Sequence, residues 1–384
     1  MNSKIKILYL ISELNVGGAE TMLYDLVTRL DRTLFDITVV SLQDEGHFGP
    51  LLKKAGITVE SLDMDHKWDI AKLTGIHTIV KDKGFDIIHS LMFHANIIGR
   101  IVAKLYKIPI NISAVHTIEK GQLWHLAIDR MTRFLVTKET VVCDAARLYM
   151  MEKTRIKSEK ITVINNGVDL TQYTGPFDIE ELKKQYELPP DKKIVGTIGS
   201  LTKPKGHIHF IKAAKWVLSK EPDTIFVIVG RGPLKKKLQH KIIQLDLDKH
   251  IRFFDYVAPI ANMLATFDCF VLSSLWEGVP ISLLEAMALK KPVVVTATGG
   301  MTEVVKNDKT GFVVPPADEK YLSNAIVEVF KDPTRTAEMG SSAYTTITQR
   351  YTIESTIKKT VFLYASLVAQ FCKKKEVKEK EGST

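Results

Sequence analysis

The sequence is poor in cysteine and has no long apolar run. Its three cysteines are Cys143, Cys269 and Cys372, and neither their odd number nor their spacing fits a disulfide framework or a metal-binding motif. We therefore expect a reducing, cytoplasmic environment. A run of about 18 apolar residues is also missing, so the sequence predicts no membrane-spanning helix. The short apolar stretch near the N-terminus is interrupted by Ser12 and Glu13, which favours a buried strand over a signal peptide.

Nucleic-acid-binding features are missing as well, although the chain is basic. The formal net charge is +9, and residues 203–252 hold twelve Lys or Arg against four Asp or Glu. Aromatic residues are not interleaved with these charges and no nucleic-acid-binding module is recognisable, so we expect no nucleic-acid partner. Three interpretations of the basic segment stay open: a solvated face, attraction of anionic substrate phosphates, and attraction to an anionic membrane surface.

The order of apolar runs predicts two domains of α/β type. Hydrophobic residues make up 45% and charged residues 25% of the 384 residues, which is typical of a soluble globular protein with room for two cores. Short apolar runs alternate with helical patterns, as in a parallel, doubly wound sheet. In the first half, strands are expected at 6–11, 35–41, 57–62, 87–90, 110–115, 139–143 and 161–164, and helices at 20–30, 49–55, 72–83, 96–106 and 123–135.

The same alternation restarts after a segment rich in Pro, Gly and charge at residues 175–193. Strands are then expected at 193–199, 225–229, 251–254, 270–272 and 291–295, with helices at 207–220 and from 234 onward. We therefore predict two Rossmann-like, doubly wound domains facing a central cleft, where the carboxyl ends of the strands bind ligands. The expected divisions are an N-terminal domain at 1–175, a second domain at 176–350, a helix at 351–372 that packs back on the N-terminal domain, and a disordered charged tail at 373–384.

The most informative motif follows the apolar run at 269–272 and opens a helix predicted to begin at Pro280. A helix N-terminus behind the carboxyl end of a strand suits an anion, because its N–H groups are free and its dipole end is positive. Glu277 precedes this helix, and Glu285 lies roughly 7–8 Å along its axis from Pro280. One carboxylate would reach a sugar ring and the other a ribose, with a diphosphate between them. The spacing therefore describes a nucleotide-sugar site.

The string Glu277-Gly-Val-Pro-Ile-Ser-Leu-Leu-Glu285 resembles the signature of retaining glycosyltransferases of family 4, which have the GT-B fold. The resemblance covers nearly the whole chain and is most specific over residues 195–315. It implies that the domain at 1–175 is the acceptor side and that the domain at 176–350 binds the nucleotide-sugar donor. It implies that Gly278, Val279 and Ile281 contact the donor beside the two glutamates. It also implies transfer of a hexose or hexosamine, with retention, from a UDP-sugar to a glycan or lipid-linked acceptor in surface polysaccharide or lipopolysaccharide biosynthesis.

A second glycine-rich loop, Gly17-Gly18-Ala-Glu20, follows the first predicted strand and opens a helix. Paired glycines let backbone approach a ligand closely, although such a pair is often only a turn. The third glycine of the dinucleotide fingerprint is missing, which disfavours an oxidoreductase. The resemblance implies that Gly17 and Gly18 face the donor diphosphate across the cleft.

The loop after the strand at 193–199 departs from the family pattern at one position. The family has an arginine and then a Lys-Gly pair, and both cations neutralise the donor diphosphate. Lys205 matches this pattern and is assigned a catalytic role, but Ser200 stands where the arginine is expected. The missing charge is expected from Lys203 or from Arg231. All four residues are predicted to line the donor site.

Two histidines of the N-terminal half stand where predicted strands end. By the resemblance, His116 is a catalytic residue that contacts the transferred sugar together with Glu277. His94 lies in a loop-to-helix junction that lines the acceptor side in the family. A lone histidine is more often structural, and the strand-end position of His116 favours a functional role. In the C-terminal half, Tyr256 and Val257 are expected to flank the nucleotide base.

We expect neither a metal nor a cofactor at the diphosphate, and this prediction rests on the expectation that no Asp-X-Asp motif occurs anywhere in the chain. Backbone N–H groups, the helix dipole and Lys205 would stabilise the leaving nucleotide diphosphate instead. Retaining glycosidases use two carboxylates about 5 Å apart, one of them a nucleophile. The sequence offers no such partner for Glu277, which favours direct front-side displacement.

Residues 123–136 are amphipathic, with Trp124, Ile128, Met131 and Leu135 at helical spacing. The first interpretation is an ordinary helix that covers the sheet with these residues. The second is an interfacial helix that docks on the inner face of a membrane carrying a lipid-linked acceptor.

Two other functions stay open at this point. A sugar-nucleotide 2-epimerase has the same architecture, but it needs additional carboxylates for proton abstraction that the sequence does not identify. A non-catalytic nucleotide-sugar-binding protein is suggested by Ser200.

Overall fold

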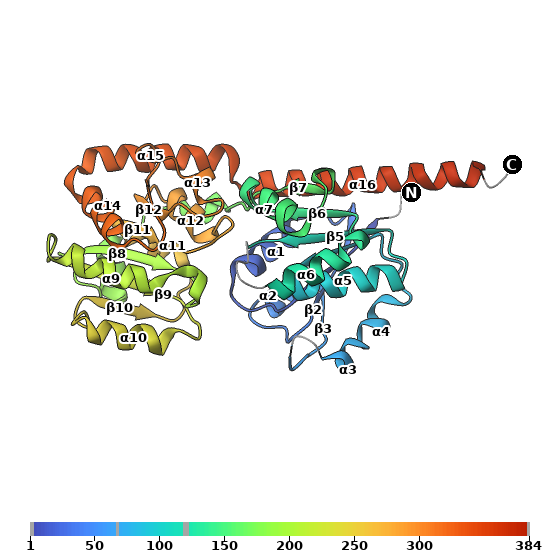
Figure 1. The fold of residues 1–384 in the computed structure, drawn as a ribbon, viewed down its shortest axis with the longest axis horizontal. Helices are drawn as coiled ribbons and strands as arrows, with labels where there is room; N and C mark the ends of the chain where they lie inside the picture. The colour runs from blue at the N-terminus through green and yellow to red at the C-terminus, as the bar shows by residue number, and fades with distance from the viewer. Residues whose placement is uncertain (1–3, 67–68, 118–122, 382–384) are drawn as a thin grey trace. The chain divides into compact units, whose positions relative to one another are not determined.

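A computed structural model, drawn as a ribbon in Figure 1, describes residues 4–66, 69–117 and 123–381. The chain divides into two compact units. The first comprises Met1–Asn165 with Ile353–Thr384, and the second comprises Asn166–Thr352. The sequence-based boundary at residue 175 therefore lies inside the second unit. Asn166 is tied to that unit, because its side-chain amide donates a hydrogen bond of 2.8 Å to the carbonyl oxygen of Val279.

The first unit is built on a seven-stranded sheet with the order β3-β2-β1-β4-β5-β6-β7, and every recorded pairing is parallel. The direction of winding reverses between β1 and β4, which is where doubly wound sheets bind ligands at the strand carboxyl ends. The strands are β1 (Ile5–Ile11), β2 (Phe35–Ser41), β3 (Thr58–Ser61), β4 (Ile87–Leu91), β5 (Ile110–Val115), β6 (Lys138–Val141) and β7 (Ile161–Val163).

Helices cover both faces of this sheet, each over its own apolar cluster. Leu23, Tyr364 and Leu367 pack on one face, and Ile98 and Val102 on the other. The helices are α1 (Gly18–Arg29), α2 (Phe48–Lys54), α3 (Ile70–Leu73), α4 (Ile76–Val80), α5 (Phe93–Leu105), α6 (Leu123–Thr132), α7 (Asp144–Thr154) and α16 (Ile353–Glu381). The single helix predicted at 72–83 is thus two short ones, α3 and α4. Gly75 stands between them, and glycine is unfavourable inside a helix.

The second unit is built on a six-stranded parallel sheet with the order β10-β9-β8-β11-β12-β13, whose winding reverses between β8 and β11. Its strands are β8 (Lys193–Ile198), β9 (Thr224–Val229), β10 (Ile251–Phe254), β11 (Cys269–Leu272), β12 (Val293–Thr296) and β13 (Phe312–Val314). Its helices are α8 (Ile179–Gln185), α9 (His207–Leu218), α10 (Lys235–Gln244), α11 (Ile260–Ala265), α12 (Ile281–Ala288), α13 (Met301–Val304), α14 (Glu319–Lys331) and α15 (Pro333–Arg350).

The predicted fold class, two Rossmann-like α/β domains with parallel sheets, is confirmed. The Pro-, Gly- and charge-rich segment at 175–193, in which no helix was predicted, contains α8, which Asp178 caps by accepting a hydrogen bond of 3.0 Å from the backbone N–H of Glu181. Within the described residues, none of the helices is both long enough and apolar enough to span a membrane.

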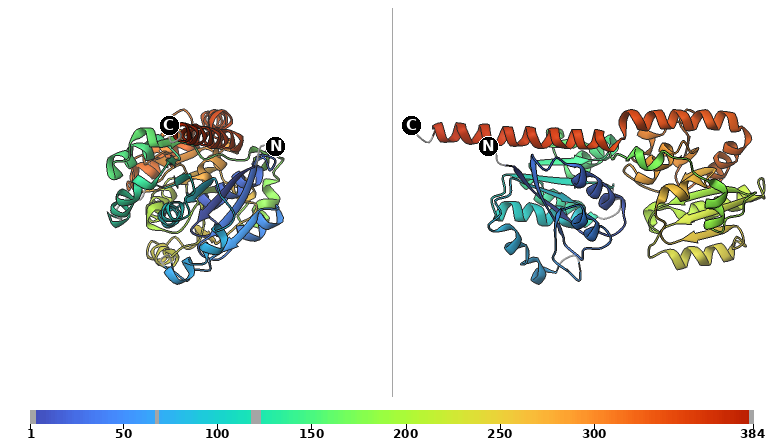
Figure 2. Two further views of the ribbon diagram at one scale, coloured as in Figure 1. Left: turned by 90° about the vertical axis from the view of Figure 1, so that its right-hand side faces the viewer. Right: turned by 180° about the vertical axis from the view of Figure 1, so that it is seen from behind.

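The prediction of a disordered tail at 373–384 is wrong as far as Glu381, because α16 continues to that residue. Residues 373–381 consist of Lys, Glu and one Val, without Gly or Pro, and Lys and Glu are favourable helix formers. These residues extend a helix that already packs on α1 and β5, so only propagation is required, not a new nucleus. The last turns of α16 run beyond the sheet of the first unit (Figures 1 and 2).

Candidate active site

Three loops of the second unit meet at the carboxyl ends of β8, β11 and β12. The backbone N–H of Leu275 donates to the carbonyl oxygen of Pro204 at 2.7 Å, which joins the β8 and β11 loops. The N–H of Gly300 donates to the carbonyl oxygen of Gly278 at 3.0 Å, which joins the β11 and β12 loops. These loops therefore form one hydrogen-bonded surface at the reversal point of the sheet.

Gly206 allows the β8 and β11 loops to lie this close. Its φ is +62°, in the left-handed region that favours glycine, and a Cβ atom there would lie 2.1 Å from the carbonyl oxygen of Ser273. The hydroxyl of Ser273 also donates to the carbonyl oxygen of Gly206 at 3.0 Å. Any side chain at this position would push apart the loops that carry Lys205 and Glu277.

Glu277 and Lys205, which were predicted from separate motifs, lie together in the structure. The Nζ atom of Lys205 forms an ion pair with Oε1 of Glu277, and the hydroxyl of Ser274 donates to the same oxygen at 3.3 Å. Glu277 is 4% exposed, so its carboxylate needs compensation for the loss of water. Lys205 supplies the opposite charge and the strongest hydrogen bond.

Glu285 lies in α12 and is held from outside its own motif. The hydroxyl of Tyr173, in the short 3-10 helix Leu170–Tyr173, donates to Oε1 of Glu285 at 2.8 Å. Pro280 is the residue before the helix, not its first residue as predicted, with an extended backbone at φ −64° and ψ 134°. Sequence reasoning missed Tyr173, because a buried aromatic residue after an interdomain crossover gives no signal apart from packing.

The remaining predicted donor contacts of this motif lie directly before α12 or at its start. Gly278 and Val279 are buried, and Ile281 is half-buried. The hydrogen bond from Asn166 fixes the carbonyl group of Val279. The first N–H groups of α12, as at any helix N-terminus, have no intrahelical acceptors.

Ser200 and the cations predicted to replace its missing charge lie in two loops that are joined by a hydrogen bond. Ser200 and Lys203 are exposed in the β8 loop, and the backbone N–H of Leu201 in that loop donates to the carbonyl oxygen of Arg231 at 2.7 Å. Arg231 belongs to the β9 loop, where a Cβ atom on Gly230 would lie 2.0 Å from the carbonyl oxygen of Gly199. The backbone of Arg231 is therefore fixed directly beside the position where the family has its arginine.

Tyr256 and Val257 follow β10, the neighbour of β9. Tyr256 is 42% exposed and Val257 is buried. The preceding Asp255 forms an ion pair with Lys235, and the hydrogen bond from this lysine lowers the pKa of the Asp255 carboxyl. Two of the lysines in the basic segment, Lys205 and Lys235, are thus engaged with carboxylates at the carboxyl edge of the sheet.

His207 is a candidate that sequence reasoning missed, although it directly follows the Lys-Gly pair. It is 3% exposed at the start of α9, and its Nδ1 atom has no hydrogen-bond partner among the described residues. Burial lowers its pKa to about 4, with a further contribution from Lys205. It is therefore neutral near pH 7 and adds no charge to the site.

In the first unit, Gly17 precedes α1 and Gly18 is its first residue. The carboxyl group of Glu20 lies against Gly17, where a Cβ atom would meet Oε2 of Glu20 at 2.3 Å. Burial raises the pKa of Glu20 to about 7. Glycine at this position therefore makes room for a buried carboxyl group at the N-terminus of the helix.

His116 follows β5, and the Nδ1 atom of its ring is buried without a hydrogen-bond partner among the described residues. Burial lowers the pKa of His116 to about 4. His89, which the sequence did not single out, has a pKa lowered to about 3 by burial and then by His116. Its Nδ1 atom lies 2.6 Å from the hydroxyl of Tyr364, which lies 2.6 Å from the hydroxyl of Tyr9. Both imidazoles are neutral near pH 7.

His94 lies in the first turn of α5, buried at the carboxyl end of β4. The predicted apolar face of α6 is not its buried face, because Trp124 is 49% and Met131 is 73% exposed. His125 and Asp129 are buried instead. The guanidinium group of Arg100 is 0% exposed, and a buried cation requires a buried carboxylate. Asp129 supplies it at 2.7 Å, and this is why polar side chains occupy the inner face of α6.

The expectation about Asp-X-Asp motifs holds for these loops but not for the whole chain. Asp63-Met-Asp65 and Asp246-Leu-Asp248 both have this pattern. Oδ2 of Asp65 accepts from the Nζ atom of Lys72 at 2.9 Å, and the second pair is exposed before the amino end of β10, at the opposite edge from the site loops. Over the described part of the chain, no group of three or more His, Cys, Asp or Glu is arranged to hold a metal ion.

Comparison with known proteins gives two family matches that follow the two halves of the chain. Residues 16–172 match the family described as Glycosyltransferase Family 4, and residues 178–346 match Glycosyl transferases group 1. The UDP-Gal:alpha-D-GlcNAc-diphosphoundecaprenol alpha-1,3-galactosyltransferase of Escherichia coli is 26% identical over 385 residues, which is 96% of this chain and 98% of that protein. The lipopolysaccharide core biosynthesis mannosyltransferase LpsB of Rhizobium meliloti is 30% identical over 214 residues, 54% of this chain and 61% of that protein.

Solved structures give the same architecture. The crystal structure of Anabaena Alr3699/HepE in complex with UDP-glucose has a TM-score of 0.85 at 24% identity, covering 94% of this chain and 100% of that one. The sucrose-phosphate synthase of Thermosynechococcus elongatus has a TM-score of 0.78 at 17% identity, covering 96% of this chain and 100% of that one. At these identities the likeness establishes the fold.

Proposed function

The chain belongs to the glycosyltransferases with the GT-B fold, and we propose that it transfers a hexose or hexosamine, with retention, from a UDP-sugar to a glycan or lipid-linked acceptor. The observation that carries this proposal is the meeting of Lys205 and Glu277 in front of α12, whose next turns carry Glu285. The names of the relatives favour a role in surface polysaccharide or lipopolysaccharide biosynthesis.

In the donor site proposed for the second unit, different residues bind the diphosphate, the sugar, the ribose and the base. The diphosphate would attract Lys205 and lie over the first N–H groups of α12, which releases the carboxylate of Glu277 to accept hydrogen bonds from sugar hydroxyls. Glu285, oriented by Tyr173, would accept the ribose hydroxyls. Tyr256 and Val257 would flank the base.

The roles proposed for the first unit are secondary to this site. The neutral ring of His116 would contact the transferred sugar as a hydrogen-bonding group, and Gly17 and Gly18 would contact the diphosphate.

The proposed reaction is a front-side displacement. The acceptor hydroxyl attacks the anomeric carbon, the bond to the diphosphate oxygen breaks, and the acceptor proton passes to that leaving oxygen. Lys205 and the N-terminus of α12 stabilise the charge that develops on the leaving group.

The direct test of this function is incubation of the full chain with separate UDP-, GDP- and ADP-sugars. We expect slow release of UDP and free sugar from a UDP-sugar, and the same rate in excess EDTA, because neither Asp-X-Asp pair lies at the site loops. Release of an isomerised UDP-sugar would indicate a 2-epimerase. No turnover of any nucleotide-sugar, with binding retained, would indicate a non-catalytic binding protein. Loss of activity in EDTA with rescue by Mn²⁺ would refute metal independence.

Arg231 is the proposed replacement for the arginine that Ser200 lacks, because its backbone is bonded to the Ser200 loop. We expect Arg231→Ala to lower kcat/KM for the donor by about 10- to 150-fold, which corresponds to the loss of one charged hydrogen bond of about 1.5–3 kcal/mol. Adding Ser200→Arg should restore most of the activity. Lys203→Ala is the matched control and should have a smaller effect. If Lys203→Ala has the larger effect, the cation is assigned to the wrong loop.

Peripheral membrane association is proposed for the end of α6 and the 3-10 helix Arg133–Leu135 that follows it, where Met131 and Phe134 are 73% and 74% exposed beside the exposed Arg130. Each Lys or Arg near an anionic surface contributes about 1 kcal/mol, which salt screens. We expect the protein to pellet with phosphatidylglycerol vesicles at low salt, less at high salt, and less again as the Met131→Ser/Phe134→Ser variant. Tyr321→Ser, at an exposed aromatic of the second unit, is the control. Pelleting that is absent at low salt would contradict the proposal.

A further inference from the structure

Four rings form a compact cluster where α5 and α6 begin. The ring of Phe93 stacks on that of His125, with centroids 3.7 Å apart and an interplanar angle of 20°. The indole of Trp124 packs against His125 at 3.9 Å and edge-on against Phe93 at 5.7 Å. His94 completes the cluster at 5.6 Å from His125. The two imidazoles are buried, whereas Trp124 is 49% exposed, so the indole is the part of the cluster offered to a ligand.

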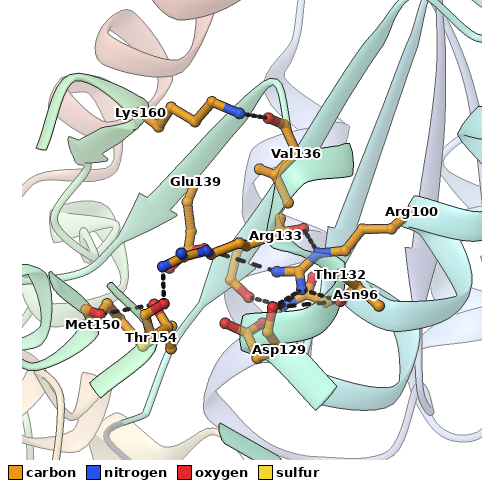
Figure 3. A network of polar contacts seen from close by, with 12 residues as sticks. Asn96, Arg100, Asp129, Thr132, Arg133, Val136, Glu139, Met150, Thr154 and Lys160 are labelled. Carbon is orange, nitrogen blue, oxygen red and sulfur yellow. Dashed lines mark hydrogen bonds and ion pairs between the residues drawn. The ribbon is translucent and has the colours of Figure 1, made fainter. Parts of the chain in front are cut away.

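The indole is held on a rigid support. The buried guanidinium group of Arg100 in α5 binds Asp129 at 2.7 Å and the hydroxyl of Thr132 at 2.8 Å, both in α6 (Figure 3). It also donates to the hydroxyl of Ser113 in β5 at 3.2 Å and lies 3.8 Å from Glu139 in β6. α6 is therefore fixed to α5 and to the sheet by charged contacts that solvent does not weaken. A fixed aromatic ring loses little freedom when it binds a ligand.

The position of the cluster is that of a ligand site. Phe93 and His94 begin α5 just after β4, at the carboxyl edge of the first sheet, and β4 is one of the two strands between which the winding reverses. Met92, between β4 and α5, has a φ of +75°, which is unusual for a residue with a side chain and is tolerated mainly where function requires it. Asn96 fixes the start of α5 to β5, because its amide donates to the carbonyl oxygen of Ala114 at 2.9 Å.

We propose that the exposed face of Trp124 is a stacking platform for a pyranose ring of the acceptor glycan. This inference rests on the proposed glycosyltransferase function and names the acceptor subsite in the first unit. The C–H hydrogens on one face of a pyranose carry a partial positive charge, which matches the negative π face of an indole ring. A membrane is the less suitable occupant of Trp124, because Met131 lies about 10 Å further along the axis of α6 and Phe134 lies beyond the end of that helix.

The test is saturation-transfer NMR on the full chain with a panel of methyl hexopyranosides and methyl N-acetylhexosaminides, in the presence of UDP. We expect at least one glycoside to receive saturation mainly on the C–H protons of one ring face. This signal should fall about tenfold in Trp124→Ala, as expected for loss of a stacking contact, and be largely kept in Trp124→Phe. Trp216→Ala is the matched control, since Trp216 is a 55% exposed tryptophan of the second unit.

Two further measurements on the same Trp124→Ala protein separate the possible failures. Its rate of UDP-sugar hydrolysis should match that of the parent, because Trp124 is not among the residues proposed to bind the donor, and its thermal unfolding should stay cooperative, which shows that the protein still folds. A glycoside signal that is unchanged by Trp124→Ala, or equally lost in Trp216→Ala, overturns the platform. Loss of vesicle pelleting in Trp124→Ala with the glycoside signal intact overturns it in favour of a membrane anchor. A parent protein without any UDP-sugar hydrolysis would instead contradict the proposed function.

Discussion

Lys205→Ala is expected to lower kcat/KM for sugar transfer by about 30- to 1000-fold, which corresponds to about 2–4 kcal/mol of transition-state stabilisation. The leaving nucleotide diphosphate gains charge as the glycosidic bond breaks. Lys205 is held beside the loop that precedes α12 by its ion pair with Glu277. Steady-state rates of donor hydrolysis or transfer give the effect directly.

The same substitution also leaves the buried carboxylate of Glu277 without its counter-charge, so lost stability must be separated from lost catalysis. Glu277→Gln removes that uncompensated charge while keeping the shape of the side chain. In the double variant Lys205→Ala/Glu277→Gln, we expect the melting temperature to return toward that of the parent while kcat/KM stays well below that of Glu277→Gln alone. A double variant as active as Glu277→Gln alone would mean that Lys205 only neutralises Glu277. Parent-like turnover by Lys205→Ala alone would place the diphosphate elsewhere.

Residues close in sequence could be predicted to act together, and those distant in sequence could not. The loop with Glu277 and the helix with Glu285 were predictable, because a strand, a Gly-containing loop and a proline at a helix start are local features. The pairing of Glu277 with Lys205 was not, because it requires the register of β11 beside β8. The hydrogen bond from Tyr173 to Glu285 joins residues 112 positions apart and also leaves no local pattern.

Two of the wrong predictions concern the buried face of α6 and the disorder of residues 373–384. The first depends on a long-range ion pair and the second on the cooperativity of helix formation. The apolar spacing of α6 predicted Trp124 and Met131 inside, but the buried Arg100 determines which face turns inward, because it needs the carboxylate of Asp129. The composition of residues 373–384 predicted disorder, since such a peptide alone has no core. Attachment to a packed helix removes the nucleation cost that this prediction assumed.

Glu285→Ala is expected to raise the KM for the donor by about 10- to 150-fold with a small change in kcat, since a charged hydrogen bond contributes about 1.5–3 kcal/mol. The ribose does not move in the reaction, so its contacts stabilise the bound donor and the transition state equally. Glu277→Ala should instead lower kcat mainly, because the sugar that it contacts changes shape and charge.

Tyr173→Phe is the matched control for Glu285. It keeps the ring and removes only the donor of the 2.8 Å hydrogen bond, so it should raise KM by less than Glu285→Ala and leave kcat alone. Initial rates over a range of UDP-sugar concentrations separate the two parameters. Equal, mild effects of Glu277→Ala and Glu285→Ala on both parameters would contradict the assignment of one carboxylate to the sugar and the other to the ribose.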